Sequence, residues 1–415
     1  MTKSPFDSQG TESSPLHIQL CHVATVRTRS GPTLTGGAGG GLVHAVGLAQ
    51  EWTRQGHFVT VFTNLPAMFE GRCTRVVVVE GTNPGMIQPH GGSLLEPLRT
   101  FLDVLASKPG LEVPAEHPSP FPHTSIIIAA SPNLADLTLA RRLSRSSGVP
   151  VIVTFHHLSP RPWWYTRRRG GIVRCTGAWL LTQTALLITK VQGFVPSIDQ
   201  VRILSESGWR FSGPVLRDEI FLDDCPNYGS LTEADRPIDV CFVSRLSAAK
   251  GLFDLLPTLL EVHRRLPTVR LVIGGDFESE SVERQFRLAA ERKGLSGSLT
   301  LKGHLSNEAK RDLLATCKIF AFPSYEEGWS LSVMEAAACG CVPVVYDLPA
   351  YDYMGSAIPR VSPGDVKALA ERLADLLRNP RKRNEVAGRL EMIPRTFTVE
   401  QTARDQIAFF RTLLR

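Results

Sequence analysis

One stretch, residues 318–346, constrains the fold more than any other part of the chain. Two apolar runs, Lys318–Ser324 (KIFAFPS) and Cys341–Tyr346 (CVPVVY), have the length and composition of buried strands. The segment between them, Trp329–Ala338, has the spacing of a short helix, and Cys339–Gly340 follows as its stop signal. A strand, a helix and a second strand in this order favour a parallel α/β sheet.

The loop and helix of this stretch carry two carboxylates, Glu327 and Glu335. On one continuous helix they would lie about 12 Å and about 80° apart, too far to bind one small group together. With Glu327 on the loop and Glu335 in the helix, they can bind the two ends of an extended ligand. The amides of Trp329, Ser330 and Leu331 would then form an anion site at the helix N-terminus, suited to a pyrophosphate. The spacing alone equally allows two solvated acids.

The same alternation of apolar runs and helical segments occupies the rest of the chain. The expected strands are 16–26, 58–63, 75–80, 125–130, 149–154, 201–204, 238–243, 269–275 and 298–302. The pattern starts twice, so it predicts two doubly wound, Rossmann-like domains with ligands bound outside the carboxyl ends of the strands.

The domain boundaries follow from composition and turn signals. We expect a disordered tail over 1–15, an N-terminal domain over 16–217, an acidic, turn-rich linker over 218–237, and a C-terminal domain over 238–395. The last segment, 396–415, is predicted to be an amphipathic helix that needs a surface to cover, such as the other domain.

Composition indicates a globular protein, with 43% hydrophobic and 21% charged residues among 415. The eight cysteines show no metal-ligand spacing, so reduced thiols and no metal site are expected. No signal peptide is recognisable, and the longest apolar run, Ala178–Ile188, is too short and too polar to cross a bilayer. These features predict a cytoplasmic protein.

Positive charge is concentrated in residues 16–217, which hold nineteen Lys/Arg against ten Asp/Glu. This excess predicts an acidic partner, either an anionic membrane surface or a phosphate-bearing substrate. No nucleic-acid recognition pattern accompanies it, so nucleic acid is not expected. Within 160–174, arginines stand beside aromatic residues, which suits a membrane interface or an acceptor, although an aromatic anchor with a solvated charge run is the alternative. The residues concerned are Trp163, Trp164, Arg167, Arg168 and Arg169.

Two further loops carry candidate binding residues. The glycine-rich loop 35–41 includes Gly39 and Gly40, where backbone amides could approach a phosphate; a functionless flexible loop is the alternative. Arg245 and Lys250 flank a strand-to-helix loop, where their charges could neutralise a pyrophosphate rather than only face solvent. His156 directly follows a buried strand and could act at the same sheet edge or simply pack there.

Together these loops resemble those of the family 4 glycosyltransferases, retaining enzymes of the GT-B fold with two facing Rossmann-like domains. The resemblance covers nearly everything after residue 16. It is carried by the glycine loop with its helix and strand (GGGLVHAVGLAQEWTRQGHFVTVFT), by TFH at 154–156, by VSRLSAAKG, and by FPSYEEGWSLSVMEAAACGCVPVV.

The resemblance implies a role for each candidate residue. Gly39 and Gly40 would approach the pyrophosphate of a nucleotide sugar, and Arg245 and Lys250 would stabilise it as it leaves. Glu327 would bind the donor sugar. The remaining assignments are the nucleotide ribose for Glu335, the transferred sugar for His156, and donor-binding positions for Gly328, Trp329, Ser330 and Leu331.

The chain departs from the family at 211–219 (FSGPVLRDE), where an asparagine–glycine turn is usual, and has no clear match around 160–200. Both departures concern the acceptor side. The resemblance therefore implies a retaining, metal-independent transferase that uses a UDP- or GDP-sugar and no cofactor. Its expected acceptor is a lipid-linked or surface glycan at the inner membrane face. A soluble acceptor, or a non-catalytic nucleotide- or glycan-binding module, are the alternatives.

Overall fold

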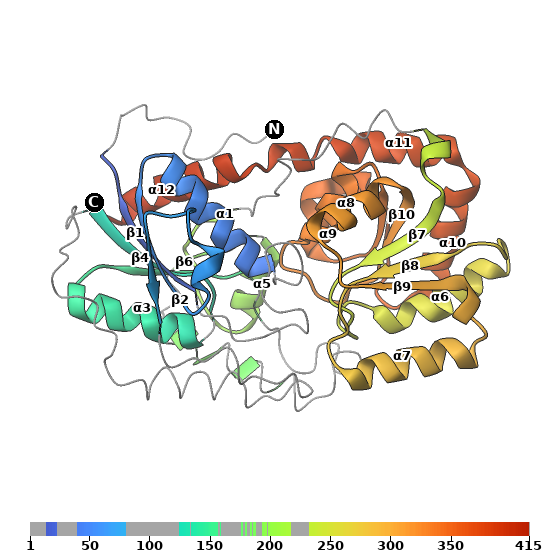
Figure 1. The fold of residues 1–415 in the computed structure, drawn as a ribbon, viewed down its shortest axis with the longest axis horizontal. Coiled ribbons are helices and arrows are strands. Elements are labelled where there is room, and N and C mark those ends of the chain that lie inside the picture. Colours follow the sequence, from blue (N-terminus) through green and yellow to red (C-terminus); the bar gives the residue numbers. More distant parts are fainter. Residues whose placement is uncertain are drawn as a thin grey trace.

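A computed structural model describes residues 14–22, 40–79, 124–132, 134–156, 158, 176, 179–180, 183–184, 186–187, 193–196, 198–216 and 232–414. Within them the chain forms two parallel six-stranded sheets, each with its own helices, which lie side by side (Figure 1). We refer to the two units as the N-terminal and C-terminal halves.

The N-terminal half has the strand order β3-β2-β1-β4-β5-β6. Its strands are β1 (His17–His22), β2 (Phe58–Thr63), β3 (Arg75–Val78), β4 (Ser125–Ala129), β5 (Val151–Thr154) and β6 (Gly193–Phe194). Its main helices are α1 (Gly40–Arg54), α3 (Leu134–Ser147) and α5 (Ile198–Glu206). Every residue of β4 is buried, as expected for a central parallel strand covered on both faces.

The C-terminal half has the strand order β12-β11-β10-β7-β8-β9. Its strands are β7 (Ile238–Val243), β8 (Leu271–Gly274), β9 (Leu299–Gly303), β10 (Cys317–Phe322), β11 (Val342–Tyr346) and β12 (Arg360–Val361). Its α-helices are α6 (Leu255–His263), α7 (Glu280–Arg292), α8 (Asn307–Ala315), α9 (Leu331–Ala338), α10 (Val366–Arg378) and α11 (Pro380–Glu391). In both sheets the order reverses beside a central strand, the arrangement that opens a crevice at the carboxyl ends.

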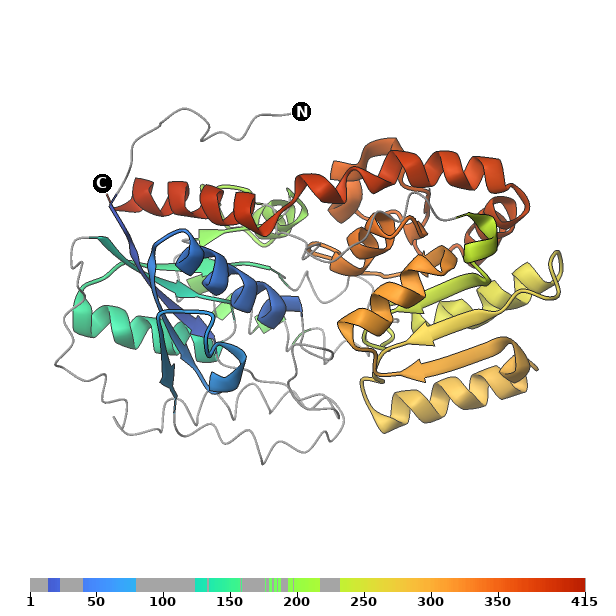
Figure 2. The ribbon, with the colours of Figure 1, turned by 45° about the horizontal axis from the view of Figure 1, so that its top comes forward.

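The last helix, α12 (Val399–Leu413), returns to the N-terminal half (Figure 2). The Thr398 side chain caps its start by accepting a hydrogen bond from the Gln401 amide at 3.2 Å. Its buried face joins the apolar core of the N-terminal half, where the ring of Phe410 meets that of Trp52 edge to face, with 6.0 Å between centroids. The chain end therefore ties the C-terminal half to the N-terminal sheet.

Three details differ from the sequence-based expectations. Residues 201–204 belong to helix α5 and not to a strand, because the residues buried there, Gln200, Ile203 and Leu204, have helical spacing. The helix after the glutamate loop begins at Leu331, since Ser330 has extended backbone angles and Trp329 lies before it. Helix α11 was not expected, because Pro380 reads as a stop; a proline is compatible with a first helical turn, where no N–H is needed.

Candidate functional site

Lys250 and Glu327 lie on the loops that follow β7 and β10, two neighbouring strands of the second sheet. Because parallel neighbours end at the same edge, the two side chains meet: Lys250 Nζ lies 2.6 Å from Glu327 Oε1. The ammonium also donates to the Glu326 carbonyl oxygen at 3.3 Å. Glu327 is only 9% exposed, and a carboxylate so buried needs a partner such as this ammonium.

The turn that presents Lys250 requires glycine at the next position. Gly251 has φ +74°, and a Cβ on it would lie 1.9 Å from the carbonyl oxygen of Pro323, at the end of β10. The turn is therefore pressed against the start of the glutamate loop. This close approach fixes the distance between the two loops and hence the position of Lys250.

Asp254, Tyr325 and Tyr346 hold the base of the glutamate loop. The Tyr325 hydroxyl donates to Asp254 Oδ2, and the Tyr346 hydroxyl donates to the same oxygen at 2.6 Å. One carboxylate thus links the segment after β7, the loop after β10 and the end of β11. Neither tyrosine has a spacing that signals this link, so the sequence does not predict it.

Glu335 lies on α9, where it pairs with Lys310 of α8 at 2.5 Å. Lys310 was not among the predicted residues, and only the packing of α8 beside α9 reveals it. Both side chains are 21% exposed, so the pair is partly accessible to solvent. Glu327 and Glu335 therefore have different cationic partners, which is consistent with each carboxylate binding a different end of a ligand.

The predicted amide site before α9 is partly engaged within the protein. The Leu331 N–H donates to the Trp329 carbonyl oxygen at 3.1 Å. The Trp329 ring is buried, stacked on Tyr353 with 4.4 Å between centroids and edge to face with Phe397 at 5.1 Å. Its ring therefore anchors the loop to the C-terminal half rather than facing a ligand.

His156 brings the N-terminal half to this loop. A Cβ on Gly328 would lie 2.2 Å from the His156 carbonyl oxygen, so the backbones of the two halves touch here. The His156 ring meets the ring of His44, on α1, edge to face at 4.3 Å. Nearby, burial and, to a smaller extent, the neighbouring His156 lower the pKa of His22 from 6.5 to about 4. His156 therefore lies beside the glutamate loop, next to His22 and His44.

The other predicted residues have no contact with the Lys250–Glu327 pair that the structure describes. Arg245 is exposed at the same sheet edge and forms no hydrogen bond or ion pair with the described residues. Gly40 begins α1. Gly39, Trp163, Trp164, Arg167, Arg168 and Arg169 lie outside the described residues. Among the described helices, none is both long enough and apolar enough to cross a bilayer.

Two protein families match the chain. Residues 38–189 match the family described as Glycosyltransferase Family 4, and residues 229–389 match Glycosyl transferases group 1. A phosphatidylinositol N-acetylglucosaminyltransferase subunit of Arabidopsis thaliana is 31% identical over 134 residues, covering 32% of this chain and 28% of that protein. The GDP-mannose:cellobiosyl-diphosphopolyprenol alpha-mannosyltransferase of Xanthomonas oryzae pv. oryzae is 30% identical over 115 residues, covering 28% and 30%. The matches span less than a third of these relatives.

Solved structures resemble the chain over nearly its whole length. HepE of Anabaena, in complex with UDP-glucose, has a TM-score of 0.69 at 15% identity and covers 96% of this chain and 99% of its own. The sucrose-phosphate synthase of Thermosynechococcus elongatus also has a TM-score of 0.69, at 17% identity, with 96% and 99% covered. These likenesses confirm the predicted fold, GT-B with two Rossmann-like domains.

Proposed function

Because this chain belongs to the group 1, family 4 glycosyltransferases, we propose that it transfers a sugar from a nucleotide-sugar donor to a lipid-linked or surface glycan. Transfer retains the anomeric configuration and uses no metal ion at the reaction centre. The observation that carries the proposal is the Lys250–Glu327 pair, placed at a carboxyl strand edge and faced by His156 across Gly328.

The donor is a UDP- or GDP-sugar whose pyrophosphate lies beside Lys250. When the nucleoside diphosphate departs, negative charge builds on its phosphate oxygens, and a fixed ammonium stabilises that charge best where water is excluded. Arg245, exposed at the same edge, is free to close on the other side of the phosphates. Lys250 can reach a phosphate by sharing its protons between that phosphate and Glu327, since an ammonium has three donors.

The carboxylates orient the two ends of the donor. Glu327 accepts hydrogen bonds from sugar hydroxyls, and its ion pair with Lys250 holds the carboxylate in position. Glu335 accepts from the nucleotide ribose, with Lys310 fixing its rotamer. The incoming hydroxyl attacks on the face that the leaving diphosphate vacates, through an oxocarbenium-like transition state. His156 lies on the sugar side of this arrangement.

Two observations support a lipid-linked acceptor at the inner membrane face. The relatives are named for phosphatidylinositol and diphosphopolyprenol substrates. The segment 160–174 combines aromatic residues with an arginine run, the composition of a membrane-surface contact. The likeness to sucrose-phosphate synthase favours the second candidate, transfer to a soluble acceptor.

A thermal-shift screen with UDP- and GDP-sugars tests the donor assignment. A donor at 100 times its dissociation constant should stabilise the protein by about 2.7 kcal/mol. The nucleotide sugar that stabilises the protein is then used as the donor in a transfer assay, and the anomeric configuration of the product is determined. The assay is run with and without a chelator. No stabilisation by any nucleotide sugar would contradict the proposal, and inversion or chelator inhibition would overturn its finer parts.

Liposome flotation distinguishes the two acceptor classes. A variant with Trp163 and Trp164 changed to alanine and Arg167–Arg169 changed to glutamine should lose binding to anionic vesicles while it still binds the donor. A matched control changes Arg381 and Lys382, exposed on α11, to glutamine. Unchanged vesicle binding in the first variant would remove the membrane proposal and leave the soluble acceptor.

A further inference from the structure

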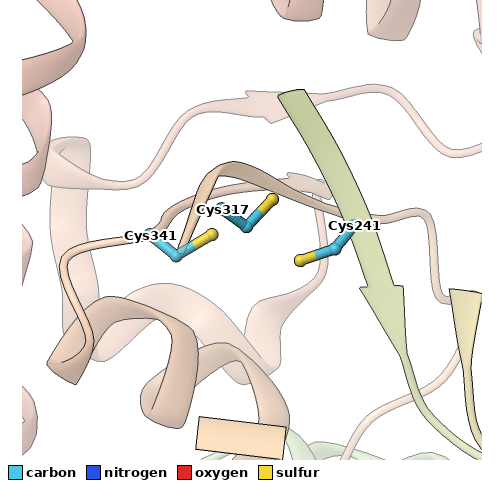
Figure 3. Close-up of side chains that lie close together, drawn as sticks. All are labelled: Cys241, Cys317 and Cys341. Carbon is cyan, nitrogen blue, oxygen red and sulfur yellow. The ribbon is translucent and has the colours of Figure 1, made fainter. Parts of the chain in front are cut away.

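Three cysteines from distant parts of the sequence meet inside the C-terminal half. Cys241 lies in β7, Cys317 begins β10 and Cys341 directly precedes β11. Their three sulfur atoms all lie within 4.8 Å of one another, and the side chains lie close together (Figure 3). No spacing motif marks them, because three strands, rather than one loop, bring them together.

The cluster has the dimensions of a three-sulfur metal site. A metal about 2.3 Å from each of three sulfurs at the corners of a triangle requires sulfur–sulfur distances of about 4 Å. The observed separations, at most 4.8 Å, exceed this distance by less than about 1 Å. The three residues are 0%, 0% and 1% exposed, so solvent does not compete for the ion.

A buried positive charge lies beside the sulfurs. Arg236 is 8% exposed, and its guanidinium donates to the carbonyl oxygens of Cys317 at 2.9 Å and Cys339 at 3.0 Å. No carboxylate of the described residues forms an ion pair with it. A buried guanidinium whose hydrogen bonds go to carbonyl oxygens is costly, so this position favours a neighbouring anion.

We propose that Cys241, Cys317 and Cys341 bind one thiophilic divalent d10 cation, such as Zn²⁺, as a structural site in the C-terminal half. The ion displaces the three thiol protons and forms three metal–sulfur bonds, so M²⁺ and three thiols give a tris-thiolate complex of charge −1 and three released protons. That charge of −1 balances the guanidinium of Arg236, whereas a monovalent ion with three thiolates would give a charge of −2. Soft sulfur ligands select such ions over Mg²⁺ or Ca²⁺.

The site is separate from the proposed chemistry. Cys317 and Cys341 lie at the amino ends of their strands, while Lys250 and Glu327 follow carboxyl ends. The ion would join three adjacent strands, β7, β10 and β11, and so stabilise the sheet on which the donor loops are built. The inference does not depend on which sugar or acceptor the protein uses.

Metal analysis of the whole chain tests the site. The protein is expressed in zinc-supplemented medium, purified without chelator or affinity tag, and analysed for metal content. We expect one zinc ion per chain, with an X-ray absorption spectrum of three sulfur ligands and at most one lighter atom. This spectroscopic measurement uses the unaltered protein and so does not depend on any variant folding. Absence of zinc, or a shell of nitrogen and oxygen, would overturn the proposal.

Single variants localise the ion. Cys317→Ala should lose the zinc, while Cys339→Ala, at an equally buried cysteine two residues from Cys341, should retain it. Zinc that persists in Cys317→Ala would contradict the site. A parallel preparation from copper-supplemented medium tests the charge argument, since retention of one copper ion in preference to zinc would exclude the divalent assignment.

Discussion

Lys250 and Glu327, from loops after two neighbouring strands, form an ion pair of 2.6 Å in which the carboxylate side chain is 7% and the lysine side chain 21% exposed. Glu327 is followed directly by Gly328, which contacts the His156 carbonyl group of the N-terminal half. The pair thus connects donor binding to the contact between the two halves.

The pair should contribute to stability far more than a surface pair does. Glu327→Ala leaves a partly buried ammonium without its anion, and we expect a loss of about 2 kcal/mol in the free energy of unfolding. A double-mutant cycle with Lys250→Ala, measured by urea denaturation, should give a coupling energy of about 1–2 kcal/mol. The exposed pair Arg264–Glu261, at the C-terminal end of α6, is the control, with an expected coupling below about 0.5 kcal/mol. Equal coupling in both cycles would contradict this account.

Catalysis should fall more steeply than stability in the same variants. Lys250→Ala removes a charge next to the proposed leaving phosphates, so kcat should fall by about 100-fold or more, by analogy with loss of one electrostatic donor. Circular dichroism should show an intact fold at the assay temperature. Lys318→Ala is a matched control, because Lys318 forms a comparable pair with Asp239 at 2.9 Å, away from the donor loops. Full activity in Lys250→Ala would defeat the assignment of the site.

Sequence and structure agree where a local pattern determines the element. The runs 58–63 and 238–243 are strands with the bounds that their composition predicts, because parallel strands buried on both faces are continuous apolar runs. Val201–Leu204 was misassigned, since four residues cannot distinguish period 2 from period 3.6 when both faces are part-buried.

The sequence predicted which loops form the candidate site, but not how their side chains pair. The pattern placed Lys250 and Glu327 at one sheet edge, but their pairing depends on the contact of Gly251 with Pro323, which no spacing encodes. Lys310, Asp254 and the thiol cluster come from elements far apart in the sequence. Such partners are set by tertiary packing and cannot be read from one chain without its fold.

Gly328 should tolerate no side chain. A Cβ there would lie 2.2 Å from the His156 carbonyl oxygen, and backbone on the facing side cannot move as a flexible side chain would. Gly328→Ala should therefore separate the two halves locally, reduce transfer at least about 10-fold, and cost about 1–3 kcal/mol in stability. Gly297→Ala, with no atom within 4 Å of its added Cβ, is the control and should leave both quantities unchanged. Amide hydrogen exchange at residues 155–156 should be faster in Gly328→Ala and unchanged in Gly297→Ala. If Gly328→Ala has normal exchange and normal activity, the close contact is refuted.

Helix α12 should be essential for the stability of the N-terminal half. Phe410 is fully buried against Trp52 and Phe194, so Phe410→Ala leaves a cavity and should destabilise by about 3–5 kcal/mol. Leu413→Ala, on the same helix but 43% exposed, should change stability by less than about 0.5 kcal/mol. Chemical denaturation followed by Trp fluorescence measures both. Similar midpoints for the two variants would show that α12 is not docked as described.

The N-terminal half should lose stability as the pH falls from about 6.5 to about 4. Burial lowers the pKa of His57 from 6.5 to about 4, helped by the charge of Arg411, and does the same for His17 beside Arg75. Between these pH values the unfolded chain binds protons that the folded chain does not, so stability rises with pH across the window and falls on acidification. The His57 Nδ1 accepts a hydrogen bond from the Leu16 amide at 3.1 Å, which a protonated ring cannot do. In His57→Asn, the amide oxygen can accept the same hydrogen bond and does not titrate. The loss of unfolding free energy between pH 7 and pH 5, measured by urea denaturation, should therefore be smaller by about 1 kcal/mol in this variant. An unchanged pH dependence would show that His57 does not contribute to it.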